Sequence, residues 1–141
     1  MNLVDANVLI YAVNSDSTHH EVSKRWLDAS LNGASTVGFA WVALLAFLRL
    51  ATKHGVFPSP LSVEAASSRV EGWLSAPSAV VVHPTARHAS TLASLLREVG
   101  TGANLVNDAH LAALAIEHRA TVVTFDSDFV RFQGVRSLRP E

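Results

Sequence analysis

Four aspartates stand where a short apolar run of the sequence gives way to a turn or to the start of a helix. Asp5 follows the run at positions 2–4, Asp108 lies early in an apolar helical stretch, and Asp126 and Asp128 follow the run at 121–125. In a parallel sheet the carboxyl ends of the strands meet at one edge, and ligands bind beyond that edge. We therefore expect the four carboxylates to gather at one edge of a sheet.

Each aspartate also has a structural role open to it. Asp5 suits a helix N-cap, Asp108 complements a helix dipole that favours its ionised form, and Asp126 with Asp128 suits an Asx-type turn. Taken singly, these roles are favoured over a functional one. Taken together, carboxylates about 5 Å apart repel by about 3 kcal/mol at an effective dielectric constant near 20, so they need a cation or raised pKa values. Ligation by oxygen alone suits Mg²⁺ or Mn²⁺, and we predict such a metal here.

The elements that position these acids are predicted from apolar runs and helical periodicity. Strand-like runs lie at 2–4, 35–39, 79–82, 121–125 and 134–138. Helical stretches lie at 5–13, 19–32, 41–52, 62–74, 85–99 and 104–118. This alternation predicts an α/β fold of three layers, α/β/α, in which helices cover both faces of a central parallel sheet.

Three expectations concern residues outside the acid set. The stretch 41–52 is apolar on nearly every face, which favours a helix that is buried on more than one side or lies at an interface. The tryptophans Trp26, Trp41 and Trp73 have helical core spacing, so we expect packing or dimer contacts rather than stacking on bases. His19 and His20 are expected at a solvated helix start.

Size and composition exclude several classes of protein. The chain of 141 residues and 15.1 kDa predicts one domain over residues 1–141. Without Cys, disulfides, thiol catalysis and cysteine zinc sites are excluded, and a cytoplasmic location is expected. The longest uncharged apolar run, 37–48, is shorter than the roughly 20 residues of a membrane span, so no membrane helix is predicted.

The balance of charged and apolar residues points to partners. Charged residues are 16% of the chain and apolar residues 49%, whereas about 25% charged is usual, so part of the surface must be apolar and we expect a partner there. The formal net charge of −1 gives no global positive field, so any contact with nucleic acid must be local.

The order and wording of the motifs resemble the PIN domain and, within it, the VapC-type toxins of bacterial toxin–antitoxin pairs. The motifs are LVDANVLIYA from position 3, FLRLAT from 47, NDAHLAALA from 107 and VVTFDSDF from 122. Each is weak alone, but their order in so short a chain is quite specific, and the resemblance spans nearly the whole sequence.

This resemblance implies an endoribonuclease that depends on Mg²⁺ or Mn²⁺, in which a metal-activated water attacks an RNA phosphodiester. A cognate VapB-type antitoxin would silence it, and such toxins are usually homodimers. Carried over by position, Asp5, Asp108 and Asp126 would bind the metal, and Asp128, a fourth catalytic acid beside them, would be a ligand or would orient the water. The resemblance further implies that Asn7 and Thr124 support the site through hydrogen bonds. Arg49 is a candidate contact to RNA phosphate, with a solvated helix end as the alternative.

The sequence departs from the family pattern at one position. The family usually has a Glu just before the Phe-Leu-Arg segment, where this chain has Ala46, and no Glu lies between Glu21 and Glu64. Either Asp128 supplies the fourth carboxylate, which we favour, or the site holds its metal more weakly, or catalysis is lost. The last case gives the alternative function, a degenerate PIN domain that only binds RNA or protein.

Other catalytic motifs are poorly supported. No HExxH zinc motif or glycine-rich nucleotide loop occurs. The segment from Asp126 to Val130 resembles the opening motif of phosphatases of the haloacid-dehalogenase type, but too few residues follow it for the motifs that chemistry needs. The RNA target, the metal count and the oligomeric state in an antitoxin complex are left open.

Overall fold

A parallel sheet of five strands forms the centre of the computed structural model, which describes residues 1–141. The strands are β1 (Asn2–Val4), β2 (Val37–Phe39), β3 (Ala79–Val81), β4 (Thr121–Val123) and β5 (Arg136–Leu138). Their order in the sheet is β3-β2-β1-β4-β5, and every pair is parallel. The first strand of the chain therefore lies beside the fourth, with Val4 opposite Val123. This register places the carboxyl end of β1, near the start of the sequence, beside the carboxyl end of β4, near its end.

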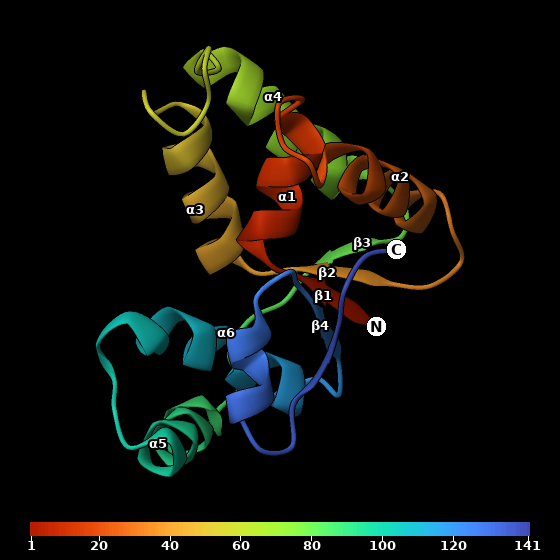
Figure 1. The fold of residues 1–141 in the computed structure, drawn as a ribbon. Coiled ribbons are helices and arrows are strands. Elements are labelled where there is room, and N and C mark those ends of the chain that lie inside the picture. Colours follow the sequence, from red (N-terminus) through yellow and green to blue (C-terminus); the bar gives the residue numbers. More distant parts are fainter.

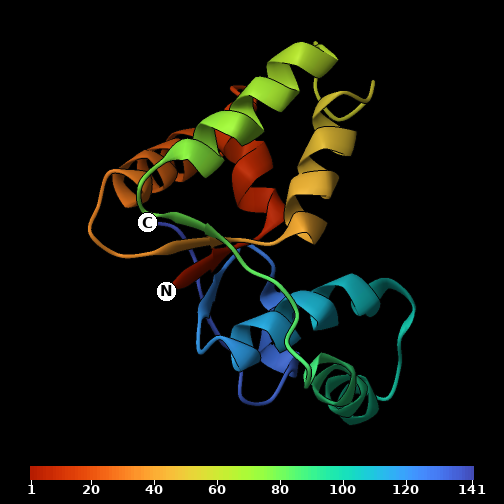
Figure 2. The same ribbon diagram turned by 180° about the vertical axis from the view of Figure 1, so that it is seen from behind.

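Helices cover both faces of the sheet, which confirms the predicted three-layer α/β architecture. In Figure 1, α1 to α4 lie on one side of the sheet and α5 and α6 on the other, and Figure 2 shows the same division from behind. The helices are α1 (Ala6–Val13), α2 (His20–Leu31), α3 (Trp41–Ala51), α4 (Val63–Ser75), α5 (His88–Val99) and α6 (Val106–Glu117). None of them combines the length and the apolar character that a bilayer crossing requires.

The hydrophobic core has two parts, one for each face of the sheet. Successive side chains of a strand point to opposite faces, so Val4 packs with the cluster under α1 to α4, whereas Leu3 packs with the cluster against α6. Val123 and Val122 divide between the same two clusters. Because both faces are buried, β1 and β4 hold a fixed position relative to the helices that follow them.

The helix ends follow local sequence signals. Asp5 and Ser62 cap α1 and α4 through their side-chain oxygens, as their residue types predict. Gly100 ends α5 in the left-handed conformation, with φ of 73°, which glycine adopts without a steric penalty. Predicted boundaries elsewhere were shifted. The helix expected from Asn104 begins at Val106, after a 3₁₀ turn over Ala103–Leu105.

The prediction that the helix at 41–52 is buried on more than one side holds for most of its surface. Leu44 and Phe47 pack into the core, and α3 contacts both α1 and α4. One stripe is exposed, in which Trp41 is 44% exposed and Leu45 is 58% exposed, and these apolar side chains agree with the alternative expectation of an interface. Of the three tryptophans, Trp73 alone is buried.

Candidate metal centre

Asp5 lies at the carboxyl end of β1 and caps α1. Its Oδ1 accepts a hydrogen bond from the backbone N–H of Ala6 (2.7 Å), and its Oδ2 accepts from the Thr124 hydroxyl (2.8 Å) and from Nδ2 of Asn7 (3.2 Å). Burial raises the pKa of Asp5, the three hydrogen bonds oppose this rise, and the charge of Asp126 adds to it. Asp5 is thus both an N-cap and an electrostatic partner of the later acids.

Asn7 and Thr124 form a frame between β1 and β4. Nδ2 of Asn7 also donates to Oγ1 of Thr124 (3.1 Å), and Oδ1 of Asn7 accepts from the backbone N–H of Phe125 (3.1 Å). Oγ1 of Thr124 further accepts from the backbone N–H of Asp126 (2.9 Å). The Thr124 hydroxyl therefore donates once and accepts twice, which uses its full capacity. These bonds fix Asp5 and the backbone of Asp126 relative to one another.

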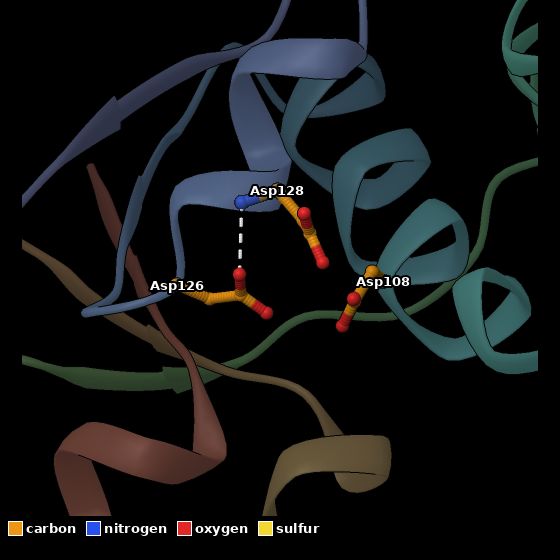
Figure 3. Close-up of side chains that lie close together, drawn as sticks. All are labelled: Asp108, Asp126 and Asp128. Atoms are coloured by element: carbon orange, nitrogen blue, oxygen red, sulfur yellow. Dashed lines mark hydrogen bonds between the residues drawn. The ribbon is translucent and has the colours of Figure 1, made fainter.

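Asp108, Asp126 and Asp128 bring their carboxylates together beyond the ends of β1 and β4. One oxygen from each lies within 4.8 Å of the others. Figure 3 shows Asp108, from α6, facing the two acids that follow β4. Oδ1 of Asp126 accepts from the backbone N–H of Asp128 (2.8 Å), which is the Asx-type turn that the sequence predicted. Oδ2 of Asp126 has no hydrogen-bond partner in the protein, so this oxygen can bind a ligand while Oδ1 forms the turn.

Repulsion within this group is not compensated by basic side chains. The pKa of Asp108 is raised to about 6, first by burial and then by the charges of Asp5, Asp126 and Asp128. The raised pKa is the outcome expected for acids that meet without a cation, and burial with three like charges outweighs any help that the N-terminus of the helix gives to the ionised form of Asp108. None of the ion pairs in the structure involves these acids.

The donor set fits a hard divalent cation. It offers carboxylate oxygens only, with no His or Cys in the group, which suits Mg²⁺ or Mn²⁺ and not Zn²⁺. A cation here would oppose the rise of the pKa values of Asp5 and Asp108, because an opposite charge favours the ionised form of each carboxyl group. Asp5 is not among the three acids within 4.8 Å, although its charge acts on Asp108.

Ala46 lies at this site. It lines a hollow of about 120 Å³ together with Asp5, Asp108 and apolar side chains that include Val42 and Leu111. The position where a Glu was expected therefore faces the acids. Ala46 supplies no carboxylate, and Asp5 and Asp108 are the only acids that line the hollow.

Arg49 is not brought to the acids. It is exposed in the last turn of α3, does not line the hollow, and is not among the charges that shift the pKa of Asp108. His19 and His20 stand at a helix start, as expected, because His19 is the N-cap of α2 and His20 its first residue, but the expectation that they are solvated is wrong. His19 stacks on Phe125, and Nδ1 of His20 lies 2.9 Å from the carbonyl oxygen of Tyr11.

A second polar cluster was missed by sequence reasoning. Oε2 of Glu117, which is 1% exposed, lies 2.5 Å from Nδ1 of His88, and Nε2 of His88 lies 2.8 Å from Nδ1 of His110. Oε1 of Glu117 accepts from the backbone N–H and the hydroxyl of Thr85. The cluster joins α5 to α6. No spacing signal could have revealed it, since its members are scattered over three segments.

Comparison with known proteins places these features in a family. The family model for the PIN domain matches residues 3–135. The chain is 67% identical over 140 residues to Ribonuclease VapC37 of Mycobacterium tuberculosis, a match that covers 99% of this chain and 97% of the relative.

Solved structures share the fold at low identity. VapC20 of Mycobacterium tuberculosis, described as a sarcin-ricin loop cleaving toxin, has a TM-score of 0.69 and 21% identity over 96% of this chain and 99% of its own. A toxin–antitoxin complex from Klebsiella pneumoniae has a TM-score of 0.65 and 19% identity over 100% of this chain and 98% of its own. With the sequence match over nearly the full length, these findings show that the chain belongs to the PIN domain family and, within it, to the VapC ribonucleases.

Proposed function

We propose that this chain is a divalent-metal-dependent endoribonuclease, the toxin of a toxin–antitoxin pair. The observation that carries the proposal is the set of three carboxylates, from Asp108, Asp126 and Asp128, whose oxygens lie within 4.8 Å of one another without a basic partner. In this proposal Asp5, Asp108 and Asp126 hold Mg²⁺ or Mn²⁺, and Asp128 is the fourth catalytic acid. The relative named as a ribonuclease, at 67% identity, supports RNA as the substrate.

The protein side chains have distinct tasks in this reaction. The bound ion supplies charge neutralisation for an RNA phosphodiester and lowers the pKa of water. Thr124 and Asn7 hold the Asp5 carboxylate in place, with Oδ2 of Asp5 engaged by both. Asp128 stands beside the metal-binding acids, where a carboxylate can orient a water molecule or accept its proton.

A VapB-type antitoxin and a second copy of the chain are the proposed partners. Support comes from the related toxin–antitoxin complex and from the exposed apolar side chains of α3, Trp41 and Leu45. Apolar side chains one helical turn apart on an exposed face are typical of a protein contact. Ala46 favours weaker metal binding than a Glu at the same position would give. The three converging carboxylates of Asp108, Asp126 and Asp128 nevertheless disfavour a domain that only binds RNA or protein.

The test is cleavage of RNA by the purified chain with Mg²⁺, with Mn²⁺ and with EDTA. We expect cleavage only with a metal. The cleavage rate should fall by at least about 100-fold in Asp108→Asn and in Asp126→Asn, which is the usual effect of removing one group that stabilises charge in the transition state. Asp16→Asn, which changes an exposed acid in the loop before α2, is the matched control. Cleavage that survives in both site variants as in Asp16→Asn would reject the assigned site.

A further inference from the structure

A group of aromatic rings and one arginine borders the acid site. It consists of Tyr11, His19, Phe125 and Arg139, and we call it the aromatic cluster. The rings of His19 and Phe125 are stacked with centroids 4.5 Å apart, and the ring of Tyr11 lies 5.1 Å from His19 and 5.3 Å from Phe125. The guanidinium carbon of Arg139 lies 4.9 Å from the Phe125 centroid. Tyr11 meets Phe125 edge-on and is tilted against His19, so the three rings and the cation form one continuous group of stacked, tilted, edge-on and cation–π contacts.

The fold places this cluster at the same edge of the sheet as the acids. Phe125 is the residue between Thr124 and Asp126, and its backbone N–H is bound by Asn7, which also binds Asp5. Arg139 follows β5, the neighbour of β4, so it lies at the same edge of the sheet. A strand of RNA that runs along this edge from the acids meets the cluster next.

The polar groups of the cluster are free to bind a ligand. Arg139 is exposed and takes part in no ion pair, so its charge is not spent on a protein carboxylate. The hydroxyl of Tyr11 and the ring nitrogens of His19 have no hydrogen-bond partner, and all three rings are partly exposed. A positive group is also what an acidic site needs nearby, because RNA phosphates are repelled by carboxylates.

We infer that the aromatic cluster is a subsite for one nucleotide of single-stranded RNA next to the scissile phosphodiester. The base stacks on a planar group of the cluster, in which His19 and Arg139 both contact the Phe125 ring, and the Arg139 charge attracts the backbone phosphate. Proteins bind single strands through such a combination of planar side chains and cations. The inference rests on the proposed RNA cleavage and adds to it the residues that position the strand.

Steady-state cleavage of a short single-stranded RNA tests the subsite. We expect His19→Ala and Arg139→Ala to raise KM by roughly 5- to 100-fold, the range that loss of one stacked base gives, with kcat within about twofold of the original. The matched controls, His54→Ala and Arg69→Ala, change exposed residues in the loop after α3 and on α4 and should leave KM unchanged. His19→Phe keeps a ring for stacking and should restore KM, which a purely structural role of the imidazole nitrogens would not allow.

A second measurement separates this inference from the proposed activity. Binding of a labelled RNA is followed by fluorescence anisotropy in EDTA, with the intact strand and with strands that each lack one base. For the unaltered chain, one of the abasic strands should bind more weakly than the intact strand. For His19→Ala, that abasic strand and the intact strand should bind equally well. Absence of cleavage with this binding pattern intact would overturn the proposed function alone. If the cluster variants have the same KM and the same RNA affinity as their controls, the proposed subsite is wrong.

Discussion

The hydroxyl of Thr124 donates a hydrogen bond of 2.8 Å to Oδ2 of Asp5, across 119 positions of the sequence. This bond joins the carboxyl end of β4 to that of β1. Oγ1 of Thr124 also accepts from the backbone N–H of Asp126, so a single side chain holds two acids that come from opposite ends of the chain. The geometry of the acid site depends on this link.

Replacement of Thr124 by Val should destabilise the protein, because Val keeps the shape and removes the hydroxyl. The buried Asp5 carboxylate then loses a donor, which costs about 1–3 kcal/mol in the free energy of unfolding. Thr124→Ser keeps the hydroxyl and should recover most of this loss. Urea denaturation at pH 7.5 in EDTA measures both variants. If Val and Ser prove equally stable, the hydroxyl does not perform the role assigned to it.

Asp108 should make the metal-free protein less stable as the pH rises. Its pKa is about 6 in the folded chain, above the ordinary value of 3.8, so folding favours the protonated form. That contribution to stability is complete below pH 3.8 and is lost as the pH rises through about 6. Asp108→Asn carries no charge at any pH and should therefore be more stable than the original chain at pH 7.5, by about 1–2 kcal/mol after allowance for solvent screening.

Urea denaturation in EDTA at pH 4.5 and pH 7.5 checks this prediction. The advantage of Asp108→Asn should shrink toward the lower pH, where the original side chain is mostly protonated. Asp16→Asn should show no such dependence, because Asp16 lies in an exposed loop outside the acid group. An advantage of equal size at both pH values would mean that repulsion among the acids is not its source.

Ala46→Glu should return a carboxylate to the hollow that Asp5 and Asp108 line. A further negative charge raises the affinity for Mn²⁺ and makes the metal-free site more repulsive. We expect Mn²⁺ to bind at least about tenfold more tightly, which corresponds to about 1.4 kcal/mol. Ala46→Gln has nearly the same size without the charge and serves as the control. Isothermal titration that finds no difference between Glu and Gln at this position would show that residue 46 does not face the ion.

Glu117 should stabilise the contact between α5 and α6. Burial alone would raise its pKa, but hydrogen bonds from Thr85 and His88 outweigh burial and hold the pKa below its ordinary value. A lowered pKa contributes stability that is present above pH 4.5 and is lost as the pH falls through the folded value. Glu117→Gln should cost about 1–3 kcal/mol at pH 7 and less in acid. Thermal unfolding of Glu117→Gln and of Glu98→Gln, which changes an exposed acid of α5, tests this prediction. Equal losses of stability in the two variants would contradict the role assigned to Glu117.

The fold was predictable because its signals are local. Alternation of apolar runs with helical periodicity gave the layers, and Asp5, Ser62 and Gly100 marked helix ends through their own side chains or backbone freedom. The exposure of Trp41 and Leu45 was not predictable, because a helix that is apolar on every face does not reveal which face the rest of the fold covers.

The acid site was predictable only in part. Strand ends and family motifs pointed to the acids, but the sequence does not give the energies that decide their protonation. The dipole at the start of α6 favours ionised Asp108, and its effect was overestimated because burial and neighbouring charges depend on the packed structure. The contacts of His19 with Phe125, and of His88 with Glu117, join residues far apart in the chain without any periodic signal.

Titration of the metal-free chain with Mn²⁺ at pH 7.5 tests most directly whether separate aspartates form one cation site. We expect saturable binding that raises the thermal unfolding midpoint, since an ion that binds only the folded state stabilises it. Binding should weaken below pH 6, where protons compete for Asp108. It should be lost in both Asp108→Asn and Asp126→Asn and kept in Asp16→Asn. Undiminished binding in the two site variants would contradict the account.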